Sequence, residues 1–181
     1  MLSLDLWEKA AQFHGHKCPG LAMGFKACEG AIEELGLSAD GASSVDEELV
    51  CIVENDACGV DAVQALLSCT YGKGNLIPRL RGKMAFSFFT RENGRGVRLC
   101  LKPGCGSNLD RAAFQEYLIS TPYDQLFDVK VPPYGLPERA RLFKSERCAV
   151  CGEVTAEYAL RIQNGKPVCA DCYDAYEREG F

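Results

Sequence analysis

Cysteine is the residue type with the greatest chemical potential in this sequence. There are 11 cysteines against only 2 histidines. Thiolate and imidazole are ligands that soft transition metals prefer, and a thiolate is also a nucleophile. An odd number of cysteines argues against a framework of paired disulfides, so we expect reduced thiols. Their positions divide them into two candidate metal-binding groups and a set of core residues.

Four cysteines near the C-terminus have the spacing of a zinc site. Cys148 and Cys151 form one Cys-x-x-Cys pair, and the 17 residues 152–168 separate it from the pair Cys169 and Cys172. Two such turns point four thiolates at one centre, about 2.3 Å from a Zn²⁺ ion. Unligated cysteines, a redox pair and a rubredoxin-like iron site are the alternatives.

The sequence around these pairs predicts a treble-clef-like finger. Asn164-Gly165 is typical of a hairpin turn between the pairs. Residues 170–179 are predicted to be helical, which places the second pair at a helix N-terminus, where the helix dipole favours thiolate. A module of about 35 residues has too small a core to fold unaided, so we expect Zn²⁺ to supply folding energy.

Both histidines lie in one short segment, His14-Gly-His16-Lys-Cys18-Pro19-Gly20. If it is extended, alternate side chains converge, and in a helical turn His14 and Cys18 still meet at i and i+4. Cys18 is the expected N-cap of a helix, a position that lowers a thiol pKa, and Cys58 begins another predicted helix. These four residues are candidate catalytic residues. We expect His16, Cys18 and Cys58 to bind a second Zn²⁺ or other transition metal, with His14 as fourth ligand or proton carrier.

Two acidic residues near Cys58 are candidates to orient an imidazole of this site. They are Asp56 and Asp61, and a carboxylate that accepts from one ring nitrogen fixes the other for ligation. The plainer alternative is a histidine pair that satisfies loop backbone beside buried structural cysteines.

Hydrophobic periodicity predicts the elements that position these side chains. Helices are expected at 4–12, from Pro19 to near Gly36, at 58–69 and at 110–119. Strands are expected at 49–54, 83–91, 96–101 and 127–131. Asn93-Gly94 predicts a hairpin. We therefore expect an α+β core over residues 1–131, a linker rich in proline and charge over 132–147, and the four-cysteine module over 148–181.

The overall composition is that of a globular protein. The 181 residues are 47% hydrophobic and 25% charged, which excludes disorder of the whole chain. A net charge of −5 disfavours a broad nucleic-acid surface. No apolar run is long enough for a membrane helix, and the acidic start is unlike a signal peptide, so we expect a cytoplasmic protein without membrane contact.

Four segments of the chain, in this order, resemble the E-subunit family of formylmethanofuran dehydrogenase: 13–24, 53–64, 69–76 and 82–91. The resemblance covers most of residues 5–131, and the appended module is similar to the treble-clef zinc finger that some members carry. It implies an α+β core, a tightly intertwined homodimer and a metal-binding cleft.

The resemblance also assigns residues to that cleft. The matched positions are His14, His16, Cys18 and Cys58. Lys73 and Asn75 are candidates for its lining.

The family name comes from an enzyme complex that interconverts carbon dioxide and methanofuran with formylmethanofuran. Its redox cofactors belong to other subunits. The resemblance implies a metal-dependent protein of one-carbon or molybdenum/tungsten metabolism, as a subunit of an oxidoreductase with protein partners. The alternative is a non-catalytic metal sensor, carrier or adaptor whose finger contacts protein or nucleic acid.

Overall fold

The computed structural model describes residues 2–38 and 44–176, and the chain divides into two compact units. The first unit spans Met1–Ala140 and the second spans Arg141–Phe181. This division falls inside the segment 132–147 that the sequence marks as a linker. In the described ranges no helix is both long enough and apolar enough to cross a membrane.

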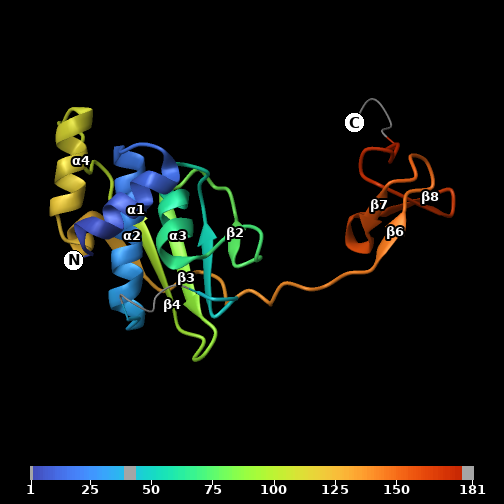
Figure 1. Ribbon diagram of the computed structural model, residues 1–181, viewed down its shortest axis with the longest axis horizontal. Helices are drawn as coiled ribbons and strands as arrows, with labels where there is room; N and C mark the ends of the chain where they lie inside the picture. Colours follow the sequence, from blue (N-terminus) through green and yellow to red (C-terminus); the bar gives the residue numbers. More distant parts are fainter. Residues whose placement is uncertain (1, 39–43, 177–181) are drawn as a thin grey trace. The chain divides into compact units, whose positions relative to one another are not determined.

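A five-stranded sheet forms the centre of the first unit, with the strand order β2-β1-β3-β4-β5 (Figure 1). Its strands are β1 (Leu49–Val53), β2 (Leu76–Pro78), β3 (Ala85–Thr90), β4 (Gly96–Leu101) and β5 (Phe127–Lys130). β1 pairs with β2 in parallel, and the other neighbouring pairs are antiparallel. Every residue of β1 is buried, which explains why its sequence is continuously apolar.

Helices cover one face of this sheet (Figure 1). They are α1 (Leu4–His14), α2 (Pro19–Leu35), α3 (Gly59–Leu67), α4 (Arg111–Ser120) and the short α5 (Tyr123–Leu126). The predicted boundaries of α2 are confirmed: Cys18 is its N-cap, Pro19 its first residue, and Gly36 ends it with a φ of 69°. The α+β fold class is therefore confirmed.

Glycines let α2 approach the start of α3 very closely. A Cβ placed on Gly24 would lie 2.0 Å from the carbonyl oxygen of Gly59. A Cβ on Gly59 would lie 3.0 Å from the carbonyl oxygen of Gly20. Any larger side chain at these positions would separate the helices, so the glycines determine how near Cys18 lies to Cys58.

Residues 132–140, which we call the strap, pack on the sheet face opposite the helices. Tyr134 and Leu136 pack against three buried side chains of that face: Val50, Ile52 and Phe89. Arg91 Nη1 donates to the carbonyl oxygen of Pro137 at 2.8 Å. The first part of the expected linker is thus held on the first unit.

The second unit contains two small hairpins. They are formed by β6 (Ser145–Arg147) with β7 (Val154–Ala156) and by β8 (Arg161–Gln163) with β9 (Lys166–Val168), with the 3₁₀ turn η1 (Glu157–Ala159) between them. The predicted turn at Asn164-Gly165 is confirmed, since both residues have positive φ. The Ala149 amide donates to the carbonyl oxygen of Pro167 at 2.8 Å, which joins the hairpins.

The helix expected at 170–179 is wrong over residues 170–176, which form a turn followed by irregular chain. The side-chain amide of Gln163 explains this, because it pairs with the backbone of Asp174. Its Nε2 donates to the Asp174 carbonyl and its Oε1 accepts from the Asp174 amide, both at 3.1 Å. The rest of the predicted helix lies outside the described residues.

The Gly24→Ala variant tests the close approach of the helices. Because the added Cβ would overlap the Gly59 carbonyl, we expect the free energy of unfolding of the first unit to fall by about 2–3 kcal/mol. Trp7, the single tryptophan, is buried in this unit, so its fluorescence during chemical denaturation reports the change. Gly72→Ala is the control, since nothing lies within 4 Å of a Cβ there. Equal stability of the two variants would contradict this account.

Candidate metal centres

Three potential ligand atoms converge where α1 ends and α2 and α3 begin. A ring nitrogen of His14 and the sulfur atoms of Cys18 and Cys58 all lie within 4.8 Å of one another. The His14 Nε2 is 3.8 Å from the Cys18 sulfur. His14 is the last residue of α1, and the two cysteines are the N-cap residues of α2 and α3. The fold therefore gathers one donor from each of three helix ends.

His16 is not part of this group, which differs from the ligand set expected from the sequence. Its ring is exposed and lies 4.6 Å from the His14 ring, between centroids. The reason is local: α1 continues to His14, and Gly15 then reverses the chain with a φ of 93°. The segment is therefore not the extended strand in which His16 and Cys18 would share a side. His14 takes the ligand position that was expected for His16.

Asp61 holds the His14 imidazole. The His14 Nδ1 lies 2.7 Å from Asp61 Oδ2, and Gln64 Nε2 donates to Asp61 Oδ1 at 3.1 Å. With Nδ1 occupied in this way, Nε2 is the nitrogen directed at the Cys18 sulfur. Of the two acidic residues that the sequence offers for this role, the structure brings Asp61 to the imidazole. Asp56 lies in the wall of the adjoining cavity.

The electrostatics of the two thiols suit a cation. The Leu21 amide donates to the Cys18 sulfur at 3.3 Å, as the N-cap position predicts. Burial and the neighbouring Cys18 thiol raise the pKa of Cys58, because a second negative sulfur would lie close to the first. Two thiols and an imidazole are the donor set that a soft divalent ion accepts, and such an ion would offset that repulsion.

A cavity of about 470 Å³ adjoins this group. His14, Cys58, Asp56 and Asp61 contribute polar atoms to its wall. Much of the remaining wall is apolar: Val53, Val60, Tyr71, Leu76, Pro78 and Leu80. Cys18, which is only 3% exposed, is not a lining residue. Since β1 and β2 are parallel, the cavity lies where their carboxyl ends meet the start of α3, a usual place for ligands in such sheets.

Lys73 and Asn75, expected as cleft lining, do not line this cavity and have structural roles instead. The fully buried Asn75 donates through Nδ2 to the carbonyl oxygens of Asp46 and Leu49, both at 3.0 Å. Lys73 Nζ donates to the Ser44 carbonyl at 2.6 Å. Both side chains thus fix the loop that leads into β2.

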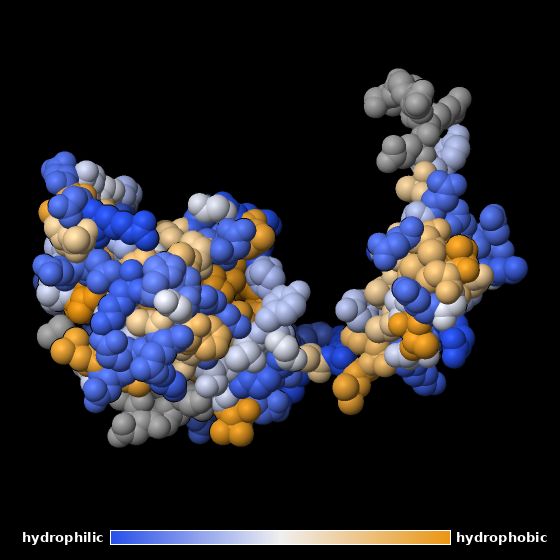
Figure 2. Space-filling model, turned by 45° about the horizontal axis from the view of Figure 1, so that its top comes forward, coloured by the Kyte–Doolittle hydropathy of each residue, from blue (hydrophilic) through white to orange (hydrophobic). Residues whose placement is uncertain are grey.

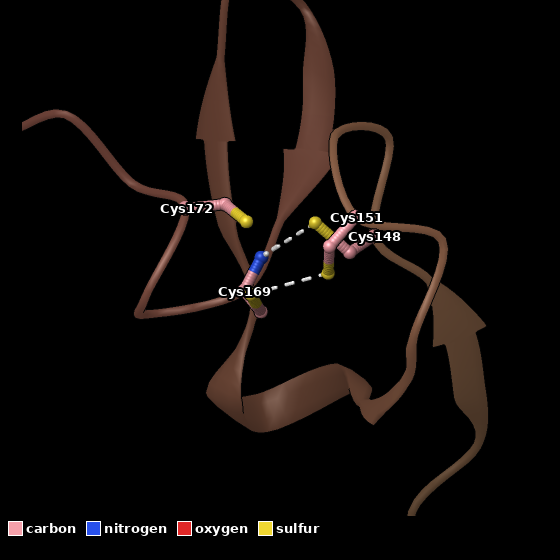
Figure 3. A group of neighbouring side chains, drawn as sticks. All are labelled: Cys148, Cys151, Cys169 and Cys172. Carbon is pink, nitrogen blue, oxygen red and sulfur yellow. Dashed lines mark hydrogen bonds between the residues drawn. The ribbon is translucent and has the colours of Figure 1, made fainter.

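The second centre is the four-cysteine cluster of the second unit (Figure 3). The sulfur atoms of Cys148, Cys151, Cys169 and Cys172 lie within 4.8 Å of one another. The backbone amides of Cys169 and Val150 donate to the Cys148 sulfur, both at 3.4 Å. The spacing that predicted a zinc finger does gather the four thiols at one centre.

The thiols of this cluster cannot all ionise without a cation. The amide of Cys169, with those of Cys151 and Val150, lowers the pKa of Cys148 to about 6. Hydrogen bonds with Cys169 and then Cys151 raise the pKa of Cys172 to about 12. Four thiolates in this arrangement therefore require a metal ion between them.

Comparison with known families identifies the first unit. Residues 13–126 match the family FmdE, described as molybdenum formylmethanofuran dehydrogenase operon. The chain belongs to the FmdE family. The resemblance expected from the four sequence segments is thereby confirmed, and the matched range contains all three donors of the first centre.

Two relatives place this FmdE protein further. A protein from Syntrophus aciditrophicus that is itself similar to FmdE of tungsten formylmethanofuran dehydrogenase shares its fold, with a TM-score of 0.64 and 23% identity over 93% of this chain and 90% of the other. A probable S-adenosyl-L-methionine-binding protein from Archaeoglobus fulgidus is 30% identical over 195 residues. That alignment covers 93% of this chain and 52% of the relative, so the chain spans about half of the relative's length.

Asp61→Asn tests whether the carboxylate supports the first centre. Because the imidazole would lose its anionic partner, we expect the affinity of that centre for Zn²⁺ to fall about ten- to a hundredfold. The measurement is competition against a coloured chelator. Asp56→Asn is the matched control, since Asp56 lines the cavity without bonding to His14. An equal loss in both variants would assign the effect to local charge alone.

Proposed function

We propose that this FmdE-family protein holds a soft divalent metal ion, with Zn²⁺ as first choice, at His14, Cys18 and Cys58, and acts on a small molecule in the adjoining cavity. The supporting observation is the convergence of three donors from three helix ends beside that cavity, with Asp61 on the imidazole. When bound, such an ion supplies Lewis-acid chemistry. A second Zn²⁺ stabilises the four-cysteine finger.

The surrounding side chains have separable roles in this proposal. Asp61 fixes the direction of the His14 ring through Nδ1. Cys18 is held by the Leu21 amide, so its sulfur is positioned before any ligand arrives. Asp56 is a carboxylate in the cavity wall, where it can accept a hydrogen bond or a proton from a ligand.

The place of the protein in metabolism is part of the same proposal. The family description names the molybdenum formylmethanofuran dehydrogenase operon. We therefore assign the chain to one-carbon or molybdenum/tungsten metabolism, as a homodimer that associates with an oxidoreductase. A cytoplasmic location accords with this assignment.

An adaptor function is the alternative, in which the finger provides the contact surface. Apolar side chains are exposed on the second unit (Figure 2). Three of them are more than half exposed: Val150 at 69%, Val154 at 63% and Ile162 at 71%. Exposed aliphatic side chains of this kind favour a protein partner over nucleic acid.

The ligand of the cavity is the less defined part of the proposal, and S-adenosyl-L-methionine is a specific candidate. The relative from Archaeoglobus fulgidus carries that ligand in its name. The cavity suits such a molecule, because Tyr71 and Leu76 offer apolar contact to a purine while Asp56 offers a carboxylate to hydroxyl or cationic groups.

Titration calorimetry with S-adenosyl-L-methionine tests this candidate on the full chain. We expect saturable binding that Asp56→Asn weakens about tenfold, since a charge-assisted hydrogen bond is lost. Asp128→Asn is the control, because that exposed carboxylate lies on β5 and outside the cavity wall. Absence of saturable binding would remove this ligand and leave the metal centre unaffected.

Elemental analysis of the full chain tests the two metal centres. We expect about two ions per chain in the unaltered protein and about one in His14→Ala. A Cys148→Ser/Cys151→Ser variant is also expected to hold about one, because the finger loses two ligands. His16→Ala is the matched control and should keep about two, because that ring does not join the donor group. Full metal content in His14→Ala, or its loss in His16→Ala, would refute the proposed ligand set.

A further inference from the structure

A second hollow of about 310 Å³ in the first unit is rich in cations. Its lining includes four cationic side chains, one carboxylate and one phenol: Arg79, Arg81, Lys83, Arg98, Glu54 and Tyr134. This concentration of positive charge contrasts with the net charge of −5 of the whole chain. The hollow shares no lining residue with the cavity beside His14.

The single carboxylate is already neutralised. Arg98 donates to both oxygens of Glu54, from Nε at 2.7 Å and from Nη2 at 3.0 Å. These bonds, chiefly, lower the pKa of Glu54, so it is ionised and matched by one guanidinium. Arg79, Arg81 and Lys83 have no carboxylate within ion-pair distance in the described ranges.

The three unmatched cations are placed by the backbone. The amide of Arg79 donates to the Val53 carbonyl at 2.8 Å, and the amides of Arg81 and Lys83 donate to the Glu54 carbonyl at 2.9 and 3.2 Å. The segment 79–83 is thus tied to the end of β1 at every second residue. Alternate side chains of an extended segment share a side, so the three cations face one hollow.

The strap fixes one of these cations from above. The Arg79 guanidinium lies over the Tyr134 ring, 4.5 Å from its centroid. The Tyr134 hydroxyl is in turn 2.9 Å from Ser87 Oγ and donates to Glu54 Oε1 at 3.2 Å. Arg79 is therefore held in position without losing its charge.

We propose that Arg79, Arg81 and Lys83 form a binding site for the diphosphate group of a small molecule. Three unmatched positive charges complement the charge of a diphosphate, and guanidinium groups present paired donors to phosphate oxygens. The limited volume of the hollow favours a compact anion over a polymer. This site is distinct from the proposed metal centre, although both adjoin one loop, since Pro78 and Leu80 line the other cavity.

The probe is inorganic pyrophosphate, titrated calorimetrically into the full chain. We expect Arg81→Gln/Lys83→Gln to weaken its binding at least about tenfold, because two charge-assisted contacts are lost. Lys9→Gln/Arg111→Gln is the matched control, since it removes two exposed charges elsewhere in the same unit and should change affinity less than about twofold. Unchanged Trp7 fluorescence during denaturation shows that each variant is folded.

Two further arms identify the source of the phosphates and separate this site from the metal. ADP that binds as tightly as pyrophosphate indicates recognition of the phosphates alone, and tighter binding of ADP indicates a nucleotide; orthophosphate should bind more weakly than either. His14→Ala should retain pyrophosphate binding. No saturable binding, equal weakening in both double variants, or loss confined to His14→Ala would overturn the proposal.

Discussion

The close packing of α2 against the start of α3 is the constraint on which the candidate metal centre depends. The Gly24 backbone lies directly against the Gly59 carbonyl, and no side chain separates the two helices there. Both helices begin with a cysteine N-cap, so this contact alone brings Cys18 to Cys58. The third donor, His14, arrives because α1 ends at the same place. Ligand geometry is in this way a property of helix packing and not of a flexible loop.

Two units of the chain gather sulfur for different purposes. In the first unit, α1, α2 and α3 pack on a five-stranded sheet, and the donor group lies beside a cavity. In the second unit, the four thiols are themselves most of the buried core, with Cys148 and Cys169 joined mainly by Val168. A metal in the first unit therefore suits ligand binding, whereas in the second it replaces a hydrophobic core.

Much of this arrangement could be predicted from the sequence where local chemistry decides the structure. The N-cap Cys18 with Pro19, and the Asn164-Gly165 turn, are examples, since each depends on near neighbours. β2 was missed because it has three residues and ends in proline, and is held only by pairing with β1. The side-chain pairing of Gln163 with the Asp174 backbone likewise has no signature in the sequence. His14 and His16 could not be ranked without knowing where α1 ends.

Asn75 restricts what the loop before β2 can become. Its amide donates to the backbone carbonyls of Asp46 and Leu49 and accepts from the Thr70 amide, with no exposure to water. An aspartate has nearly the same shape, but it would replace two donors by a buried negative charge facing carbonyl oxygens. Deamidation at this one position would therefore loosen the loop that carries Tyr71 into the cavity wall, without altering the volume of any side chain.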